Sequence, residues 1–102
     1  MSGVVDKKAG TIIVVTYDND KREKSACDLM PLIKSIENKV SNKEGLRIYI
    51  GMDFGKYDRL HHKIFINKIV EININDEWKN GLSSIDYIDD DHYKSAVKYV
   101  TC

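Results

Sequence analysis

The chain has 102 residues, of which 42% are hydrophobic and 31% are charged, and its 16 basic and 16 acidic residues leave no net charge. This length and composition predict one folded domain with a single core of modest size. The balanced charge excludes a general electrostatic attraction to nucleic acid, and it also excludes an acidic mimic of DNA.

The sequence contains no segment that predicts export or membrane insertion. The N-terminus lacks the apolar core of a secretory signal, and no apolar run approaches the length of a membrane span. Two cysteines, Cys27 and Cys102, are too few for a disulfide scaffold. We therefore expect a cytoplasmic protein with no membrane contact. The preference for Lys over Arg and the abundance of Ile are typical of an AT-rich genome, for which a viral or phage source is one hypothesis.

The N-terminal part of the chain predicts an arm and a first strand. Residues 1–10 are polar and contain Gly3 and Gly10, which predicts a flexible N-terminal arm, and residues 11–102 are the expected single α+β domain. Residues 11–17, TIIVVTY, are β-branched and apolar at consecutive positions. This pattern predicts a strand that is covered on both faces or is central in its sheet.

A helix is predicted after this strand, because apolar residues recur at spacings of four, three and four between residues 29 and 40. Pro31 must lie in the first turn, since a proline further along would remove a backbone hydrogen bond. Asp28 is therefore the expected N-cap, and Gly45 is the expected end of the helix. The alternative is a capping box of Ser25 and Asp28, with a kink at the proline.

Two further strands are predicted in the middle of the chain. Residues 46–54, LRIYIGMDF, carry apolar side chains at alternate positions. Residues 61–73, HHKIFINKIVEIN, predict a long strand whose alternation shifts by one residue near Asn67 and Lys68. Such a shift turns every later side chain to the opposite face, so we expect a β-bulge there. A turn follows at residues 76–81.

The C-terminal segment is compatible with two predictions. Ile85, Ile88 and His92 lie at helical spacing, and Ser83 with Asp86 has the pattern of a capping box. One outcome is a single helix that reaches about residue 100. Residues 96–101, AVKYVT, have a strong β preference, so the other outcome is a short helix followed by a final strand.

Together these elements predict an α+β fold with a single two-layer domain: an antiparallel sheet of three or four strands with two helices on one face. The order is β-α-β-β-α, and a final strand would complete the ferredoxin-like order. A sheet of this kind has free edges, and a homodimer formed through one edge is a further hypothesis. The expected core comprises Ile12, Val14, Leu29, Ile33, Ile36, Val40, Ile48, Ile50, Ile64, Ile66, Ile69, Ile72 and Ile88.

The stretch IGMDFG, residues 50–55, resembles the I-G-x-D-x-G strand of RNase H-like nucleases and actin-like ATPases. In those families the aspartate at the strand end holds a divalent metal or positions a phosphate, and the resemblance implies this role for Asp53 in a metal-dependent nuclease. The chain after Asp53 leaves little room for the further strands and carboxylates of those folds. We therefore interpret the stretch as the connection between two antiparallel strands.

Acidic residues are concentrated near the C-terminus, where Asp89, Asp90 and Asp91 are consecutive and Asp86 precedes them. Consecutive residues on a helix are about 100° apart, so these carboxylates do not converge on one metal ion. Asp90 and Lys94 also have the spacing of an ion pair. We predict that Asp86, Asp89, Asp90 and Asp91 bind a protein partner, with a solvated surface of no function as the alternative.

The local basic cluster of the sequence lies between the two middle strands and comprises Lys56, Tyr57, Arg59, His61 and Lys63. A basic hairpin with an aromatic residue at its tip can follow a phosphate backbone and stack a base. This cluster is the expected site of the alternative function, which is the binding of RNA or DNA.

No sequence motif indicates catalysis or a cofactor. The chain has no P-loop, no glycine-rich dinucleotide motif and no Cys-x-x-Cys pair. His61 and His62 are adjacent on a predicted strand and point to opposite faces, which excludes joint chelation of a metal. We therefore expect no metal and no cofactor. The function we favour is a small non-enzymatic protein-binding regulator, inhibitor or adaptor.

Overall fold

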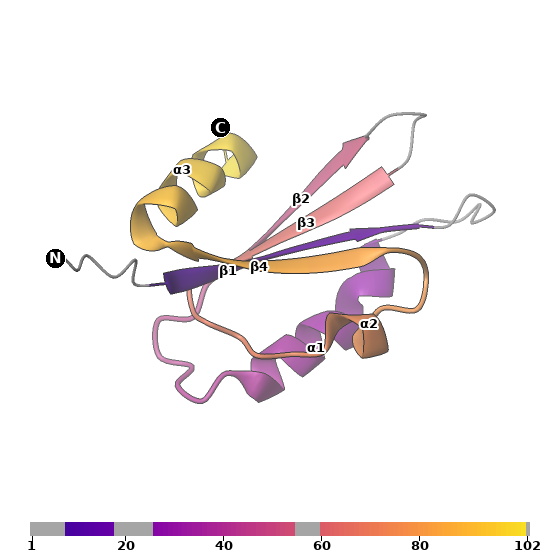
Figure 1. The fold of residues 1–102 in the computed structure, drawn as a ribbon, viewed down its shortest axis with the longest axis horizontal. Coiled ribbons are helices and arrows are strands. Elements are labelled where there is room, and N and C mark those ends of the chain that lie inside the picture. Colours follow the sequence, from indigo (N-terminus) through magenta and orange to yellow (C-terminus); the bar gives the residue numbers. More distant parts are fainter. Residues whose placement is uncertain (1–7, 18–25, 55–59, 102) are drawn as a thin grey trace, which may run out of the picture.

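The computed structural model describes residues 8–17, 26–54 and 60–101. They form an α+β fold in which helices lie on both faces of one four-stranded antiparallel sheet (Figure 1). The strands are β1 (Lys8–Thr16), β2 (Ile48–Phe54), β3 (Leu60–Ile66) and β4 (Ser83–Asp89). The helices are the 3-10 turn η1 (Ala26–Leu29), α1 (Met30–Lys39), α2 (Ile74–Glu77) and α3 (Asp90–Thr101). No helix in the described part of the chain combines the length and the hydropathy that a membrane span requires.

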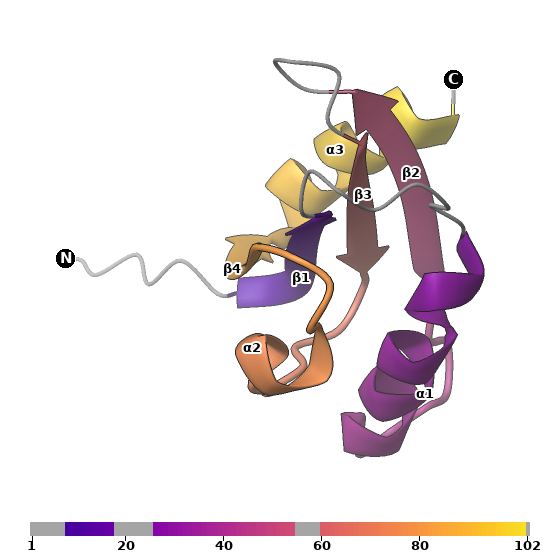
Figure 2. The ribbon, with the colours of Figure 1, turned by 90° about the vertical axis from the view of Figure 1, so that its right-hand side faces the viewer.

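The strands lie in the order β2-β3-β1-β4, and each neighbouring pair is antiparallel. β2 and β4 are therefore the edges of the sheet (Figure 2). Ile48 is paired with Ile66, and Phe54 is paired with Leu60. The stretch around Asp53 thus leads from one strand toward its antiparallel neighbour, as the sequence predicts, and residues 55–59 lie outside the described residues.

β1 has apolar side chains on both faces, and helices cover both faces of the sheet. Ile13 and Val15 are fully buried in the core with α1, whereas Ile12 and Val14 are half-buried on the opposite face. The prediction of a central strand with two covered faces is confirmed. The strand begins at Lys8, so its first residues belong to the sheet and not to the N-terminal arm to which the sequence assigns them.

α1 packs on the sheet through Leu32 and Ile36, which are both buried and lie one helical turn apart. Pro31 lies in the first turn of the helix, as the sequence predicts. The hydroxyl of Ser35 donates a hydrogen bond to the carboxylate of Glu77, which joins α1 to α2. These two helices therefore form one layer.

Both predicted ends of this helix are wrong. Leu29 precedes α1 without a capping side chain, and Asp28 lies in η1, where its carboxylate accepts a hydrogen bond from the hydroxyl of Tyr17. α1 ends at Lys39, well before Gly45. Gly45 instead has a φ of 73°, a left-handed conformation that favours glycine, in the turn that precedes β2.

The main core lies between the sheet and the layer of α1 and α2. Some core predictions are wrong: Ile12 and Val14 lie on the other face, because the alternation of β1 is displaced by one residue from the expected one. Ile50 and Ile69 are 42% and 40% exposed, because Ile50 lies on the edge strand and Ile69 lies beyond the end of β3. The buried core comprises Ile13, Val15, Tyr17, Leu29, Leu32, Ile36, Val40, Leu60, Ile64, Ile66, Val70, Ile74 and Trp78.

β3 ends at Ile66 and does not continue to residue 73 as the sequence predicts. The side-chain oxygen of Asn67 accepts the backbone N–H of Arg47 at 2.7 Å, and its amide group donates to the carbonyl of Gly45 at 2.8 Å. The hydroxyl of Thr11 donates to the carbonyl of Lys68 at 2.8 Å. The shift in the hydrophobic alternation therefore marks the end of a strand and not a bulge within it.

Of the two predictions for the C-terminal segment, the helix that reaches about residue 100 is correct only from Asp90 onward, and the final strand is wrong. Residues 83–89 form β4 and not a helix, and residues 96–101 belong to α3 and not to a final strand, so the predicted ferredoxin-like order with a last strand there is not observed. The half-buried Ile85 and Tyr87 alternate with two exposed residues, and β4 pairs with β1 along its length. This ladder stabilises a strand that local helical spacing does not reveal.

The helices also do not share one face of the sheet, as predicted. Figures 1 and 2 show α1 and α2 on one side and α3 on the other, so the domain has three layers and not two. The first turn of α3 lies close to β1: a Cβ atom on Gly10 would be 2.8 Å from Cδ1 of Tyr93. The absence of a side chain at Gly10 is thus what permits this contact. The Tyr93 hydroxyl is buried without a partner among the described residues, and burial raises the pKa of Tyr93.

Candidate functional site

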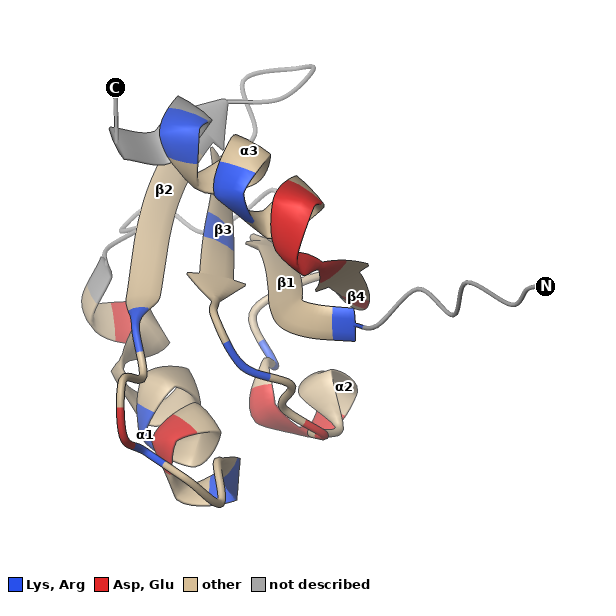
Figure 3. Ribbon diagram, turned by 90° about the vertical axis from the view of Figure 1, so that its left-hand side faces the viewer, with Lys and Arg blue, Asp and Glu red and all other residues tan. Residues whose placement is uncertain are grey.

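The four predicted acidic residues lie on β4 and the first turn of α3, and Figure 3 shows basic segments further along that helix. Asp89 Oδ1 accepts hydrogen bonds from the backbone N–H and from Nδ1 of His92, both at 2.8 Å. The backbone N–H of His92, and after it the imidazole, hold the pKa of Asp89 below its usual value. Asp89 therefore caps α3.

The other acidic residues are exposed, and one of them also has a partner within α3. Asp90 Oδ2 lies 2.9 Å from Nζ of Lys94, one turn along the helix, and this hydrogen bond raises the pKa of Lys94. Asp86 and Asp91 are exposed on β4 and on α3. Two of the four predicted partner-binding residues thus have structural roles at the start of α3, and the predicted binding role stays a prediction.

The predicted nucleic-acid site is described only in part, because Lys56, Tyr57 and Arg59 lie outside the described residues. His61 and Lys63 are two positions apart on β3, so both point away from the main core. They share this face with Phe65, which is buried on the side of α3. An imidazole, a cation and an aromatic ring therefore follow one another along one face of β3.

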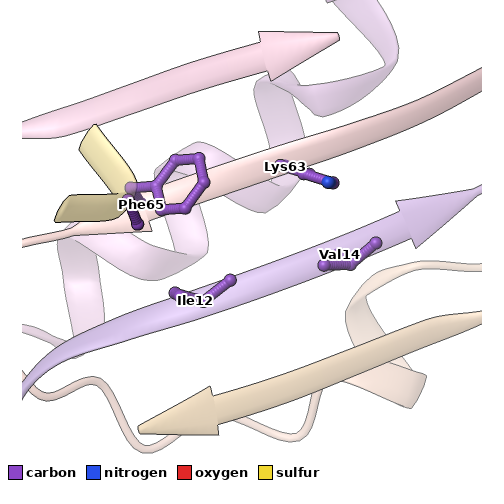
Figure 4. A pocket seen from close by; sticks show the side chains of 5 residues that line it. Ile12, Val14, Lys63 and Phe65 are labelled. Atoms are coloured by element: carbon purple, nitrogen blue, oxygen red, sulfur yellow. The ribbon is translucent and has the colours of Figure 1, made fainter. Parts of the chain in front are cut away.

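A pocket of about 310 Å³ lies on this face, between the sheet and α3 (Figure 4). It is lined by Ile12 and Val14 of β1, Lys63 and Phe65 of β3, and Ala96 of α3. The pocket forms because α3 presents only a methyl group here, one turn after the bulky Tyr93. Sequence reasoning missed this pocket, since it assigns Ile12 and Val14 to the main core.

The edge strand β2 exposes two large apolar side chains. Ile50 is 42% exposed and Met52 is 58% exposed. Ile50 is paired with Ile64 and Met52 with His62, so both lie on the α1 side of the sheet, separated by Gly51. No strand in the described part of the chain pairs with the outer edge of β2. The sequence predicts a free edge but assigns Ile50 to the core.

A buried polar network crosses the main core beneath η1. The Tyr17 hydroxyl donates to Oδ2 of Asp28 at 2.8 Å and lies 3.0 Å from Nε2 of His62. The Tyr17 ring also packs edge-on against Trp78, whose Nε1 donates to the carbonyl of Thr16 at 2.8 Å. The network therefore ties the end of β1 to η1, to β3 and to the segment after α2.

His62 is fully buried, and its Nδ1 has no hydrogen-bond partner among the described residues. Burial lowers the pKa of His62, although the charge of Asp28 acts in the opposite direction. The neutral imidazole is therefore the form that the fold favours. The alternation of Leu60, His62 and Ile64 is the sequence signal that places this histidine on the core face.

The described residues thus offer two surfaces to a partner, namely the β2 edge and the pocket beneath α3. Within residues 8–17, 26–54 and 60–101, no three His, Cys, Asp or Glu side chains come together in a way that could hold a metal ion. No protein-family model, curated protein or solved structure matches the chain. The β2 edge and the pocket beneath α3 are therefore the surfaces from which a function can be inferred.

Proposed function

We propose that this chain is a small non-enzymatic protein-binding module, a regulator, inhibitor or adaptor, that binds an extended segment of its partner along the free edge of β2. The observation that carries the proposal is the exposure of Ile50 and Met52 on an edge strand. Large apolar side chains exposed beside unpaired backbone groups are typical of a surface that another chain covers.

The backbone of β2 supplies the first part of this surface. An edge strand presents a row of unpaired N–H and C=O groups, to which an extended segment can add as a further strand. β2 has one charged residue, Asp53 near its end, and residues 48–52, IYIGM, carry no charge. The opposite edge, β4, carries Asp86 at an exposed position and ends at Asp89. Because charged residues commonly protect edges from such pairing, β2 is the better docking edge.

The side chains supply the second part and indicate the chemistry of the partner. Ile50 and Met52 lie on one face, and Gly51 between them presents no side chain on the other. An added strand would therefore place alternate apolar residues against Ile50 and Met52. Met adapts to partners of varied shape, because its side chain is unbranched and polarizable. The expected partner segment is extended, uncharged at its centre and apolar at alternate positions.

The experiment is a selection of peptides from a random display library on the immobilised protein, followed by affinity measurements. We expect peptides with alternating apolar residues, and we expect Met52→Lys or Ile50→Lys to weaken their binding by about tenfold or more, because the lysine would lie at the contact. Leu82→Lys is the matched control, since Leu82 is 72% exposed but lies outside β2. Peptides without this alternation, or equal binding by all three variants, would contradict the proposal.

The β2 strand of a second copy of the chain is one segment that could pair with this edge. Antiparallel pairing of two β2 strands about Gly51 would place Ile50 of each copy opposite Met52 of the other. Sedimentation of the purified protein measures this directly. A dimer that Met52→Lys dissociates and Leu82→Lys does not would identify self-association as the use of the edge.

The second candidate function is binding of RNA or DNA, and the placement of His61 and Lys63 on one face of β3 favours it. A lysine and a histidine side by side on one strand can contact the phosphates of a nucleic-acid backbone, whereas the ring of Phe65 beside them is buried and is not offered to a base. Anisotropy of labelled oligonucleotides at two salt concentrations tests it. Binding that weakens steeply with salt, and that Lys63→Gln reduces, would support this function.

A further inference from the structure

We propose that the pocket beneath α3 is a binding site for a small organic acid, namely a molecule with a compact apolar body and a single carboxylate. This site lies on the opposite face of the sheet from Ile50 and Met52. The inference is therefore independent of partner binding at the β2 edge.

The shape and the lining of the pocket favour an apolar body. Its volume of about 310 Å³ is at the lower end of the range of small-molecule sites. Four of the five lining residues are apolar, and Figure 4 shows the ring of Phe65 on the same face as Ile12 and Val14. Transfer of an apolar ligand from water into such a lining is favourable.

The charge of the pocket favours a carboxylate. Lys63 is the one charged residue of the lining, and it forms no ion pair within the described part of the chain. An ammonium group beside an apolar wall gains a charge-assisted hydrogen bond when an anionic oxygen approaches it. A single ammonium group matches a single negative charge, whereas a phosphate usually recruits several donors.

The walls of the pocket are held in place without a ligand. β1 and β3 are neighbouring central strands, so Ile12, Val14, Lys63 and Phe65 lie on a continuous hydrogen-bonded ladder. The capping of α3 by Asp89 and the contact of Tyr93 with Gly10 fix the helix that carries Ala96. Binding therefore requires little ordering of the protein, which favours affinity for a small ligand.

The test compares two probes of the same shape, 4-phenylbutyrate and 4-phenylbutyramide, by titration calorimetry and amide chemical shifts. We expect the acid to bind about tenfold more tightly than the amide, with shift changes at β1, β3 and α3. Lys63→Gln should abolish this preference and Lys63→Arg should restore most of it, whereas Ala96→Leu should weaken both probes by filling the pocket. The matched control is Lys79→Gln, an exposed lysine outside the pocket, which should leave the preference unchanged.

Equal affinity for the acid and the amide would overturn the proposal, and so would an acid preference that survives Lys63→Gln. Two further ligands separate related chemistries. Decanoate should bind less tightly than 4-phenylbutyrate if the pocket selects compact acids, and tighter binding of decanoate would overturn the proposed compact body. A labelled oligonucleotide that binds through Lys63 while neither acid binds would assign this face to nucleic acid and overturn the proposal.

Discussion

The two faces of the sheet are built from the same strands, yet they are covered to different extents. On the face of α1 and α2, Ile13 and Ile64 are completely buried, and even the imidazole of His62 is enclosed. On the face of α3, Ile12 and Val14 are half-buried beside an open pocket. Within β1 the two faces are equally apolar, but elsewhere in the sheet the α3 face also carries His61, Lys63 and Asp86. The difference in burial therefore reflects both the strand residues and the covering helices, and a pocket remains where α3 presents Ala96.

The strongest test of this comparison is a pair of substitutions at neighbouring positions of β1. Ile13→Ala should lower the free energy of unfolding by about 2–5 kcal/mol, because it leaves a cavity in a closed core. Ile12→Ala should cost clearly less, since its side chain already borders the pocket. Both changes alter strand preference equally, so the difference between their free energies of unfolding in urea reports how tightly each face is packed. Equal losses would show that the two faces are packed alike.

A second pair compares two buried hydroxyl groups. Tyr17→Phe should cost about 1–3 kcal/mol, because it removes the donor to Asp28 and leaves Nε2 of His62 without its partner. Tyr93→Phe on the other face should leave stability unchanged or slightly raised, since its hydroxyl has no partner among the described residues. Thermal unfolding of both variants measures the difference. A larger loss of stability in Tyr93→Phe than in Tyr17→Phe would show that the hydroxyl on the α3 face contributes more to stability, which contradicts this prediction.

The third prediction concerns the pH dependence of stability. Burial lowers the pKa of His62 below its usual 6.5, so between these two values the unfolded chain binds more protons than the folded protein. The free energy of unfolding should therefore decrease as the pH falls through about 6.5, and His62 should add nothing further below its folded-state pKa. Urea unfolding at about pH 7.5 and about pH 5.5 measures this decrease. His62→Gln should reduce it, whereas the same decrease in His62→Gln as in the unchanged protein would exclude the buried imidazole as its cause.

The smallest expected effect is at the start of α3. Asp89→Ala removes the acceptor for the N–H of His92 and should increase hydrogen exchange of the first α3 amides, with only a small loss of stability. Asp91→Ala is the control, because Asp91 is exposed and does not occupy the capping position. If Asp91→Ala increased exchange as much, the cap at Asp89 would not be what holds the helix.

The fold was predictable where the spacing of apolar residues fits only a helix or only a strand, and not where the spacing fits both. The β-branched run of β1 and the helical spacing of Ile33 and Ile36 follow directly from periodicity, although the structure buries Leu32 more deeply than Ile33. Ile85 and Ile88 are three residues apart, which fits a helix, but the intervening residues also fit a strand. Pairing with β1, about seventy residues earlier in the chain, stabilises the strand, and no local preference contains that information.

The candidate surfaces were predictable in part for the same reason. Alternation along β3 is enough to separate His61 and Lys63 from His62, because it depends only on strand geometry. The exposure of Ile50 depends on the strand order, which places β2 at an edge, and sequence alone does not supply that order. The contact between Tyr17 and His62 joins residues 45 positions apart. Tertiary structure alone reveals it.

The strand order has a consequence for the synthesis of the protein. β1 is the first strand to leave the ribosome, but both of its neighbours, β3 and β4, are made later, and β4 ends only at Asp89. The most apolar stretch of the chain, TIIVVT, therefore stays without its neighbours until most of the polypeptide has been translated. Pairings so distant in sequence form slowly, and an unpaired apolar strand is prone to aggregate while it waits. Production of this protein should thus benefit from low temperature, because the hydrophobic association that drives aggregation weakens on cooling.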